Sequence, residues 1–174
     1  MPGEPVTLSV DDGIATLTMN RPERMNCLDV ETATALFIAL KDAERQKAKV
    51  IIITGSGKAF CSGGDVKAMH DAKNPEMFLM DLVKPIHDAV LAIRRSPVLV
   101  VAAVNGAATG AGCSLMLACD LKVLSEEAQL SMWFAGIGLA PGCGTGLLAE
   151  HVGLARASEM LLSGKRLSAA EALE

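Results

Sequence analysis

Two stretches of the chain have the same order of features, an apolar strand followed by small residues and a helix. Together they restrict the fold classes that the chain can adopt. Each begins with a short apolar run, Val50 to Thr54 and Val98 to Val104, of the kind that parallel sheets bury on both faces. Each run leads through small residues into a helical pattern: GKAFCSGGDVKAM at 57–69 and VNGAATGAGCSLMLACD at 104–120. Buried strands that alternate with helices predict an α/β protein.

The other segments fit this class. Alternation on both sides of Asp12-Gly13 predicts a hairpin of strands 6–10 and 14–19. Asp29 is placed to cap a helix that runs to about Lys47. Ser168 and Glu171 form a capping-box pattern that begins a last helix. Further helices are expected from near 65, over 76–95 and over 147–162, short strands at 121–124 and 129–132, and loops at 55–64, 105–110 and 136–146.

Composition narrows the function classes. Hydrophobic residues make up 51% of the 174 residues and aromatic residues only 3%, which predicts an aliphatic core. The net charge of −4 argues against nucleic acid as a partner, because phosphate backbones require a basic face. The longest apolar run, Val98 to Val104, is far too short to cross a membrane. The N-terminus does not resemble a signal peptide, so we expect a cytoplasmic protein.

The five cysteines indicate no metal site. Their number is odd, and no two of them form a C-x-x-C pair. Buried, reduced thiols are the expected state for Cys27, Cys61, Cys113, Cys119 and Cys143.

The glycine spacing separates two kinds of anion site. Gly106, Gly110 and Gly112 do not have the G-x-G-x-x-G spacing of dinucleotide-binding folds, and Gly57-Lys58 is not followed by the Ser or Thr of a P-loop. Two strand-to-helix turns in one sheet can instead aim two backbone N–H groups at one point, which makes an oxyanion hole. Either stretch taken alone is also compatible with an ordinary tight turn.

The ordered motifs NRPERMN, IIITGSGKAFCSGGD, PVLVVAAVNGAATGAG, ACDL, GIGLAPGCGTGLL and LLSGKRLSAAEAL resemble the enoyl-CoA hydratase/isomerase family, or crotonase superfamily. The resemblance implies a crotonase-like spiral of β-β-α units in a single domain, 1–174, with the family's C-terminal helical segment expected to be missing. It also implies a homotrimer or hexamer. The substrate would be a coenzyme A thioester, with no prosthetic group, metal, nucleic acid or membrane partner.

The resemblance also assigns roles to residues. The oxyanion-hole N–H donors would be Gly64 and Ala111. Arg24 and Lys58 would meet phosphates, unless they are ordinary surface charges. The expected substrate-binding residues are Arg24, Met25, Cys27, Ala59, Ser62, Gly63, Asp65, Val66 and Gly110.

The chain departs from the family at its acid/base positions. Ser114 and Phe134 stand where hydratases of the family have glutamates, and Gly142 stands where isomerases often have a carboxylate. Cys143 is a candidate substitute, with inert packing as the alternative, and Asp65 is better placed to cap a helix. Two functions remain open: an acyl-CoA enzyme with other acid/base groups, or a non-catalytic acyl-CoA-binding pseudoenzyme or scaffold subunit. A nucleotide-binding module is a third, weaker reading.

Overall fold

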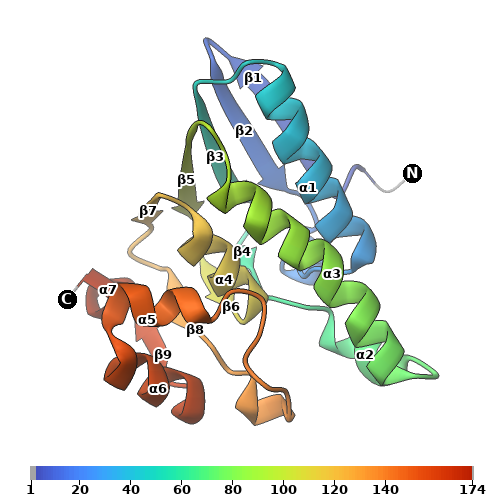
Figure 1. Ribbon diagram of the computed structural model, residues 1–174, viewed down its shortest axis with the longest axis vertical. Helices are drawn as coiled ribbons and strands as arrows, with labels where there is room; N and C mark the ends of the chain where they lie inside the picture. Colours follow the sequence, from blue (N-terminus) through green and yellow to red (C-terminus); the bar gives the residue numbers. More distant parts are fainter. Residues whose placement is uncertain (1–2, 174) are drawn as a thin grey trace.

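The computed structural model describes residues 3–173, which form two sheets and a set of helices (Figure 1). The strands of the first sheet lie in the order β1-β2-β3-β5-β7, and those of the second in the order β4-β6-β8-β9. The first sheet comprises β1 (Val6–Asp11), β2 (Ile14–Met19), β3 (Val50–Gly55), β5 (Leu99–Val104) and β7 (Leu121–Leu124). The second comprises β4 (Ala59–Cys61), β6 (Ala107–Thr109), β8 (Gln129–Ser131) and β9 (Arg166–Ser168).

The chain winds as a spiral of β-β-α units, which confirms the fold expected from the sequence. Three times, a strand of the first sheet is followed by a strand of the second: β3 by β4, β5 by β6, and β7 by β8. Each such pair is followed by helical structure, and successive units add parallel strands to both sheets. The helices of these units are α2 (Val66–Asp71), α3 (Pro75–Arg94), α4 (Ala111–Ala118), η2 (Ala135–Ile137), α5 (Gly146–Val152) and α6 (Leu154–Ser163).

The N-terminal hairpin and helix also follow the prediction. Strands β1 and β2 are antiparallel, and the turn between them places Asp12 and Gly13 at positive φ. The short 3-10 helix η1 (Pro22–Arg24) comes next. Helix α1 (Val30–Arg45) begins where the carboxylate of Asp29 accepts a hydrogen bond of 2.8 Å from the amide of Thr32.

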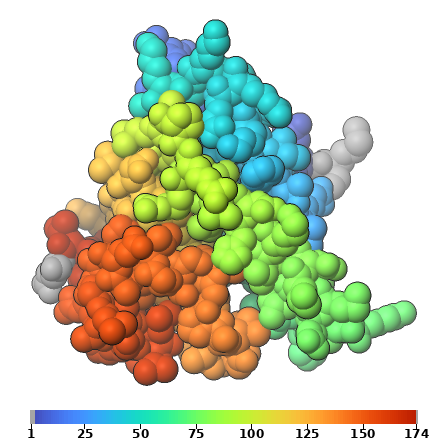
Figure 2. Space-filling view, in the orientation of Figure 1, coloured from blue at the N-terminus to red at the C-terminus, as the bar shows by residue number. Residues whose placement is uncertain are grey.

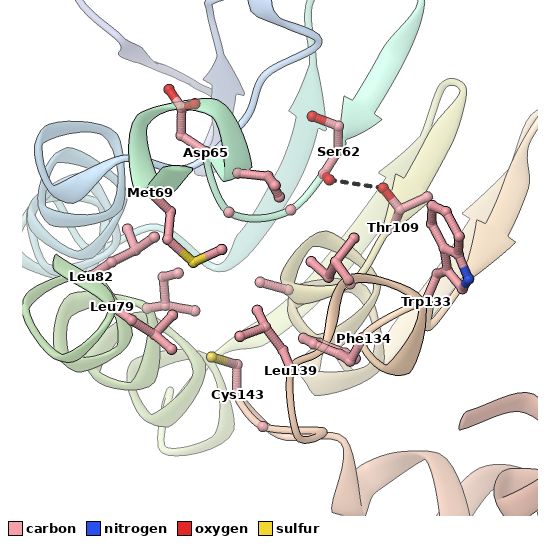
Figure 3. Close-up of a pocket in the computed structure, with 18 of the residues that line it drawn as sticks. Ser62, Asp65, Met69, Leu79, Leu82, Thr109, Trp133, Phe134, Leu139 and Cys143 are labelled. Atoms are coloured by element: carbon pink, nitrogen blue, oxygen red, sulfur yellow. Dashed lines mark hydrogen bonds between the residues drawn. The ribbon is translucent and has the colours of Figure 1, made fainter. Parts of the chain in front are cut away.

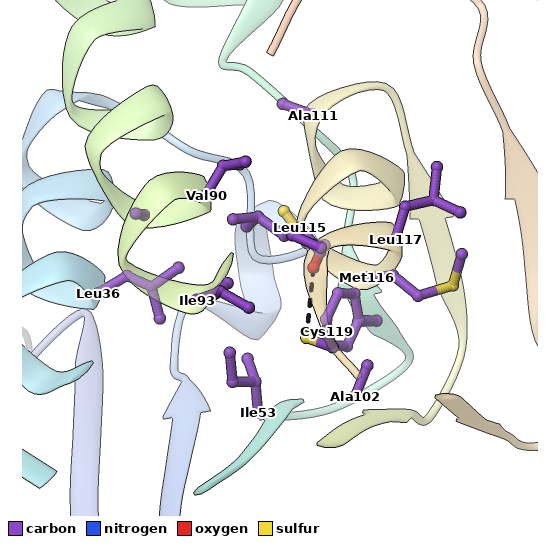
Figure 4. Packing of buried hydrophobic residues seen from close by; sticks show 14 of the residues in the cluster. Leu36, Ile53, Val90, Ile93, Ala102, Ala111, Leu115, Met116, Leu117 and Cys119 are labelled. Carbon is purple, nitrogen blue, oxygen red and sulfur yellow. Dashed lines mark hydrogen bonds between the residues drawn. The ribbon is translucent and has the colours of Figure 1, made fainter. Parts of the chain in front are cut away.

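The core is largely aliphatic, as the composition predicts, and it includes buried residues of both sheets and of the helices α1, α3 and α4 (Figure 4). Alternate residues of the strands are fully buried there, for example Ile51 and Ile53 of β3. Every residue of α4 is buried, and Leu115 of α4 packs beside Val90 of α3. Among residues 3–173, no helix is both long and apolar enough to span a membrane.

Strand β8 of the second sheet confirms the short strand expected at 129–132, whereas the other three strands of that sheet, β4, β6 and β9, were not predicted from the sequence. The segments expected to be loops contain β4 and β6, and β9 lies just before the last helix, α7 (Ala169–Leu173). Each of these strands has three residues, too few for alternation to show in the sequence, and each exists through pairing with its neighbours. The capping box is confirmed, because the amide of Ser168 donates to Glu171 at 2.9 Å and the amide of Glu171 donates to the Ser168 hydroxyl at 3.2 Å.

Glycine allows the units to approach closely. A Cβ atom at Gly112 of α4 would lie 2.1 Å from the carbonyl oxygen of Cys61 in β4. No side chain fits in that space, so α4 can rest directly on the backbone of β4. This contact brings the N-terminus of α4 next to the turn that follows β4.

We therefore expect Gly112→Ala to destabilise the protein by about 2 kcal/mol or more, because the added methyl group meets a backbone atom that cannot move aside. Gly146→Ala is the matched control, since Gly146 also lies in a helix and a Cβ there would meet no atom within 4 Å. Helix propensity predicts that Gly146→Ala is neutral or stabilising by up to about 1 kcal/mol. Urea unfolding of both variants measures the difference, and equal stabilities would contradict the close contact.

Candidate active site

A cavity of about 700 Å³ opens between the two turns, the helices α2 and α3, and the segment after β8. In Figure 2 it is the hollow between the green α2–α3 region and the orange segment near residue 140. Met69, Leu79 and Leu82 face Phe134, Leu139 and Cys143 across it (Figure 3). The remaining lining residues are Ser62, Gly63, Gly64, Asp65, Val66, Val83, Ile86, Thr109, Gly110, Ala111, Ser131, Trp133, Ile137, Ala140, Gly142, Gly164 and Arg166.

The turn after β4 and the turn after β6 lie against each other at the cavity wall. The hydroxyl of Thr109 donates a hydrogen bond of 2.8 Å to the carbonyl oxygen of Ser62 (Figure 3). Gly63 has a φ of 90°, and a Cβ there would lie 2.7 Å from the Thr109 carbonyl oxygen and 3.4 Å from the Ala111 nitrogen. Glycine at 63 is therefore needed both for its backbone conformation and for the closeness of the two turns.

The amides of Gly64 and Ala111 are free at this contact. Leu28 donates to the carbonyl of Gly63 at 2.7 Å and accepts from the amide of Asp65 at 2.9 Å. In extended chain, successive amides point in opposite directions, so the Gly64 N–H points away from Leu28. Ala111 is the first residue of α4, and its N–H has no acceptor within the helix. Among the described residues, neither amide donates a hydrogen bond.

The conformation of Gly110 determines where the Ala111 amide points. Its φ of 53° and ψ of −120° lie in a region that residues with a Cβ atom rarely occupy. Two free N–H donors therefore lie on the wall of one cavity, and such donors are the groups from which oxyanion holes are built.

The structure brings two of the three acid/base positions to the cavity. Phe134 and Gly142 line it, and a Cβ at Gly110 would lie 3.7 Å from Cζ of the Phe134 ring. Ser114 is completely buried, and its hydroxyl donates to the carbonyl of Gly110 at 3.4 Å. Ser114 is therefore a helix residue beside the site rather than part of the cavity wall.

Asp65 is the one carboxylate residue that lines the cavity within residues 3–173, and it already has partners. One carboxylate oxygen caps α2 by accepting from the amide of Ala68 at 2.9 Å, as the sequence predicts. The other lies 2.5 Å from a guanidinium nitrogen of Arg24. The side chain is only 6% exposed, so a proton acceptor for a substrate is not available there without breaking this pair.

The residues expected to hold coenzyme A divide into two groups. Five of them line the cavity: Ser62, Gly63, Asp65, Val66 and Gly110. The loop that carries Arg24, Met25 and Cys27 lies beside its rim, held by the Arg24–Asp65 pair and by a 3.1 Å hydrogen bond from the amide of Ser62 to the carbonyl of Met25. Ala59 is fully buried in β4, so any contribution from it is indirect. Lys58 is exposed.

All five cysteines are buried thiols, as expected. Burial raises the pKa of Cys61, Cys113 and Cys119 to about 12. Cys143 is different because its side chain faces the cavity, and burial raises its pKa as well. Among the described residues, no group of three His, Cys, Asp or Glu side chains is arranged to hold a metal ion.

Sequence reasoning missed the apolar wall of the cavity. Leu79, Leu82, Val83 and Ile86 of α3 recur at the spacing of one helix face, which was a visible signal. That spacing does not separate a face that packs in a core from one that borders a cavity. Trp133, Ile137, Leu139 and Arg166 had no comparable signal, because they lie in irregular segments or in the unpredicted strand β9.

Comparisons with known proteins agree with this architecture. The sequence pattern of the family described as enoyl-CoA hydratase/isomerase matches residues 9–174. The 1,2-epoxyphenylacetyl-CoA isomerase of Escherichia coli is 38% identical over 169 residues, which cover 95% of this chain and 64% of that protein. This chain thus spans less than two thirds of the length of that relative.

Solved structures give the same result. The enoyl-CoA hydratase of Mycobacterium smegmatis superposes with a TM-score of 0.90 at 36% identity, covering 97% of this chain and 66% of that one. A Thermobifida fusca protein solved in complex with acetoacetyl-CoA has a TM-score of 0.85 at 34% identity, covering 98% of this chain and 70% of that one. With the spiral of β-β-α units and the match over residues 9–174, the chain belongs to the enoyl-CoA hydratase/isomerase family.

Proposed function

We propose that the cavity binds a coenzyme A thioester and stabilises its enolate, with the thioester oxygen between the amides of Gly64 and Ala111. The observation that carries this proposal is the pair of free amides on the wall of one cavity. The relative solved with acetoacetyl-CoA supports the choice of ligand. Related proteins are named as hydratases and isomerases, which favours turnover over a purely binding role.

The proposed hole acts on the charge that develops during the reaction. When a proton or another group leaves the carbon next to the thioester carbonyl, negative charge moves to the thioester oxygen. Each backbone donor aimed at that oxygen contributes about 3 kcal/mol of transition-state stabilisation. The N-terminus of α4, which begins at Ala111, adds a favourable dipole.

Coenzyme A itself would lie along the rim formed by the loop of Arg24, Met25 and Cys27 and by the turn after β4. The exposed Lys58 supplies positive charge there, and the Arg24 side chain stays 42% exposed although it is paired with Asp65. Association into homotrimers or hexamers, which the resemblance implies, belongs to the same proposal. Exposed Leu121 and Val123 on the edge strand β7 offer an apolar surface for it.

The proposed chemistry does not centre on water addition. Hydration needs a base for water and an acid for the α-carbon, but Phe134 and Gly142 occupy the cavity positions and Asp65 is already paired. A reaction in which the enolate arises by cleavage of a carbon–carbon bond at the α-carbon suits this site better, because isomerisation, like hydration, needs a group that removes one proton and delivers another.

The oxyanion hole is tested by replacing Gly64. We expect Gly64→Pro, which removes the N–H, to weaken binding of acetoacetyl-CoA about 100-fold, since that ligand forms an enolate readily. Gly64→Ala is the control, because it keeps the N–H and its Cβ would lie 3.3 Å from the flexible end of Leu82. Calorimetric titration measures both, after melting curves have shown that each variant is folded. Unchanged binding by a folded Gly64→Pro variant would exclude this position for the ligand oxygen.

The acid/base reading is tested with crotonyl-CoA. We expect hydration by the wild type to be near background. A general acid and a general base each raise the reaction rate roughly 10²–10⁴-fold, and the positions for both are empty of carboxylates here. Phe134→Glu places a carboxylate beside Gly110 and should raise the rate, whereas Phe134→Gln has similar size without the charge and should not. Absorbance of the enoyl thioester follows the reaction, and fast wild-type hydration would show that another residue supplies the protons.

Cys143 gives a test that does not depend on activity. Its raised pKa means that little thiolate is present near neutral pH, so we expect alkylation by iodoacetamide to be slow at pH 7 and faster as the pH rises above the ordinary thiol value of 9.0. Acetoacetyl-CoA in the cavity should slow it further. Mass spectrometry of the Cys143 peptide measures the rate, with the deeply buried Cys119 as the unreactive reference. Labelling at pH 7 as fast as that of a free thiol, or unaffected by the ligand, would contradict this placement.

A further inference from the structure

The second sheet carries one row of side chains across its face to an arginine. Thr109 of β6 is in register with Ser131 of β8, and Ser131 is in register with Arg166 of β9. Residues in register on neighbouring strands project from the same face of a sheet. All three line the cavity, so Arg166 lies at the β9 end of a row that begins beside the two turns.

Within the part of the chain that the structure describes, no carboxylate compensates the charge of Arg166, because none lies within ion-pair distance of it. Its neighbour Lys165 lies 3.3 Å from Glu171, and Glu171 is also held by the capping box with Ser168. The carboxylate of the cavity, Asp65, pairs with Arg24. A free cation therefore borders a cavity whose other walls are mostly apolar.

The position of Arg166 separates it from the proposed coenzyme A rim. The order β4-β6-β8-β9 places β4, which leads into the turn of Ser62 and Asp65, at one edge of the sheet and β9 at the other. Arg166 is two strands away from Thr109, a separation of about 10 Å. Thr109 in turn precedes Ala111, whose amide would hold the thioester oxygen, by two residues in the sequence.

We infer that Arg166 is a specificity-determining residue that receives an anionic group at the far end of the acyl chain. This inference rests on the proposed coenzyme A thioester site. The preferred substrate class is then an acyl-CoA of medium length with a terminal carboxylate, rather than one that ends in a methyl group. A guanidinium binds a carboxylate through paired hydrogen bonds, and an unsubstituted alkyl end offers it no partner.

The test compares octanoyl-CoA with suberyl-CoA, which differ in a terminal methyl group against a terminal carboxylate. Trp133 is the only tryptophan of the chain and lines the cavity, so quenching of its fluorescence reports binding without turnover. We expect the wild type to bind suberyl-CoA only roughly three to ten times more tightly, because Arg166 is exposed to solvent, where water weakens an ion pair. The preference should shrink as salt is added.

Arg166→Gln should remove this preference by weakening the binding of suberyl-CoA much more than that of octanoyl-CoA. Arg156→Gln is the matched control: it removes the same charge from α6, at a residue outside the cavity, and should keep the preference. Titration with free coenzyme A shows whether Arg166 binds the terminal carboxylate of the acyl chain or a phosphate of coenzyme A. If Arg166→Gln weakens free coenzyme A as much as suberyl-CoA, the arginine meets a phosphate and the inference is wrong.

The remaining outcomes distinguish this inference from the proposal on which it rests. Equal wild-type affinities for octanoyl-CoA and suberyl-CoA would overturn the role of Arg166 and leave the thioester site intact. Failure of every coenzyme A ester to bind would overturn the site itself, and with it the assignment of Arg166.

Discussion

The site depends on direct backbone contact between two turns from successive β-β-α units. Gly63 lies so close to Thr109 that a Cβ atom would come within 2.7 Å of its carbonyl oxygen. Gly112 allows the same closeness between α4 and the backbone of β4. Because both contacts are made by backbone atoms, the positions of the Gly64 and Ala111 amides follow from the winding of the chain. The apolar core beneath α4 then holds them in place.

Around this fixed centre, the charged groups are distributed unevenly. The Arg24–Asp65 pair joins the loop before α1 to the start of α2, and among residues 3–173 it leaves no free carboxylate on the cavity wall. Phe134 and the helix α3 supply apolar surface on both sides of the free amides. An oxyanion formed in such surroundings is stabilised mainly by fixed dipoles, which act more strongly where water is scarce.

Much of this was predictable from the sequence, and the reason differs from element to element. The strands of the first sheet and the helices α1 and α3 are long enough for their hydrophobic patterns to identify them. Asp29, Asp65 and Ser168 cap helices as their positions predict. Strands β4, β6 and β9 could not be predicted, because three residues carry no period and their pairing is set by tertiary structure. The assignment of Gly64 and Ala111 as donors came from their positions in the motifs and stays a prediction, whereas the burial of Ser114 and the place of Arg166 follow only from the three-dimensional structure.

The use of backbone donors has a consequence for how such a protein can change over generations. A mutation at 64 or 111 leaves the N–H in place unless it introduces proline, so most single substitutions cannot delete the donors. Phe134 and Gly142 lie in irregular segments after β8, where exchanging one side chain for another disturbs little of the core. The backbone donors at 64 and 111 are thus hard to lose by mutation. The residues at 134 and 142 can be replaced by proton donors or acceptors with little effect on the rest of the fold. One scaffold can in this way acquire different acid/base side chains while its two backbone N–H groups stay in place.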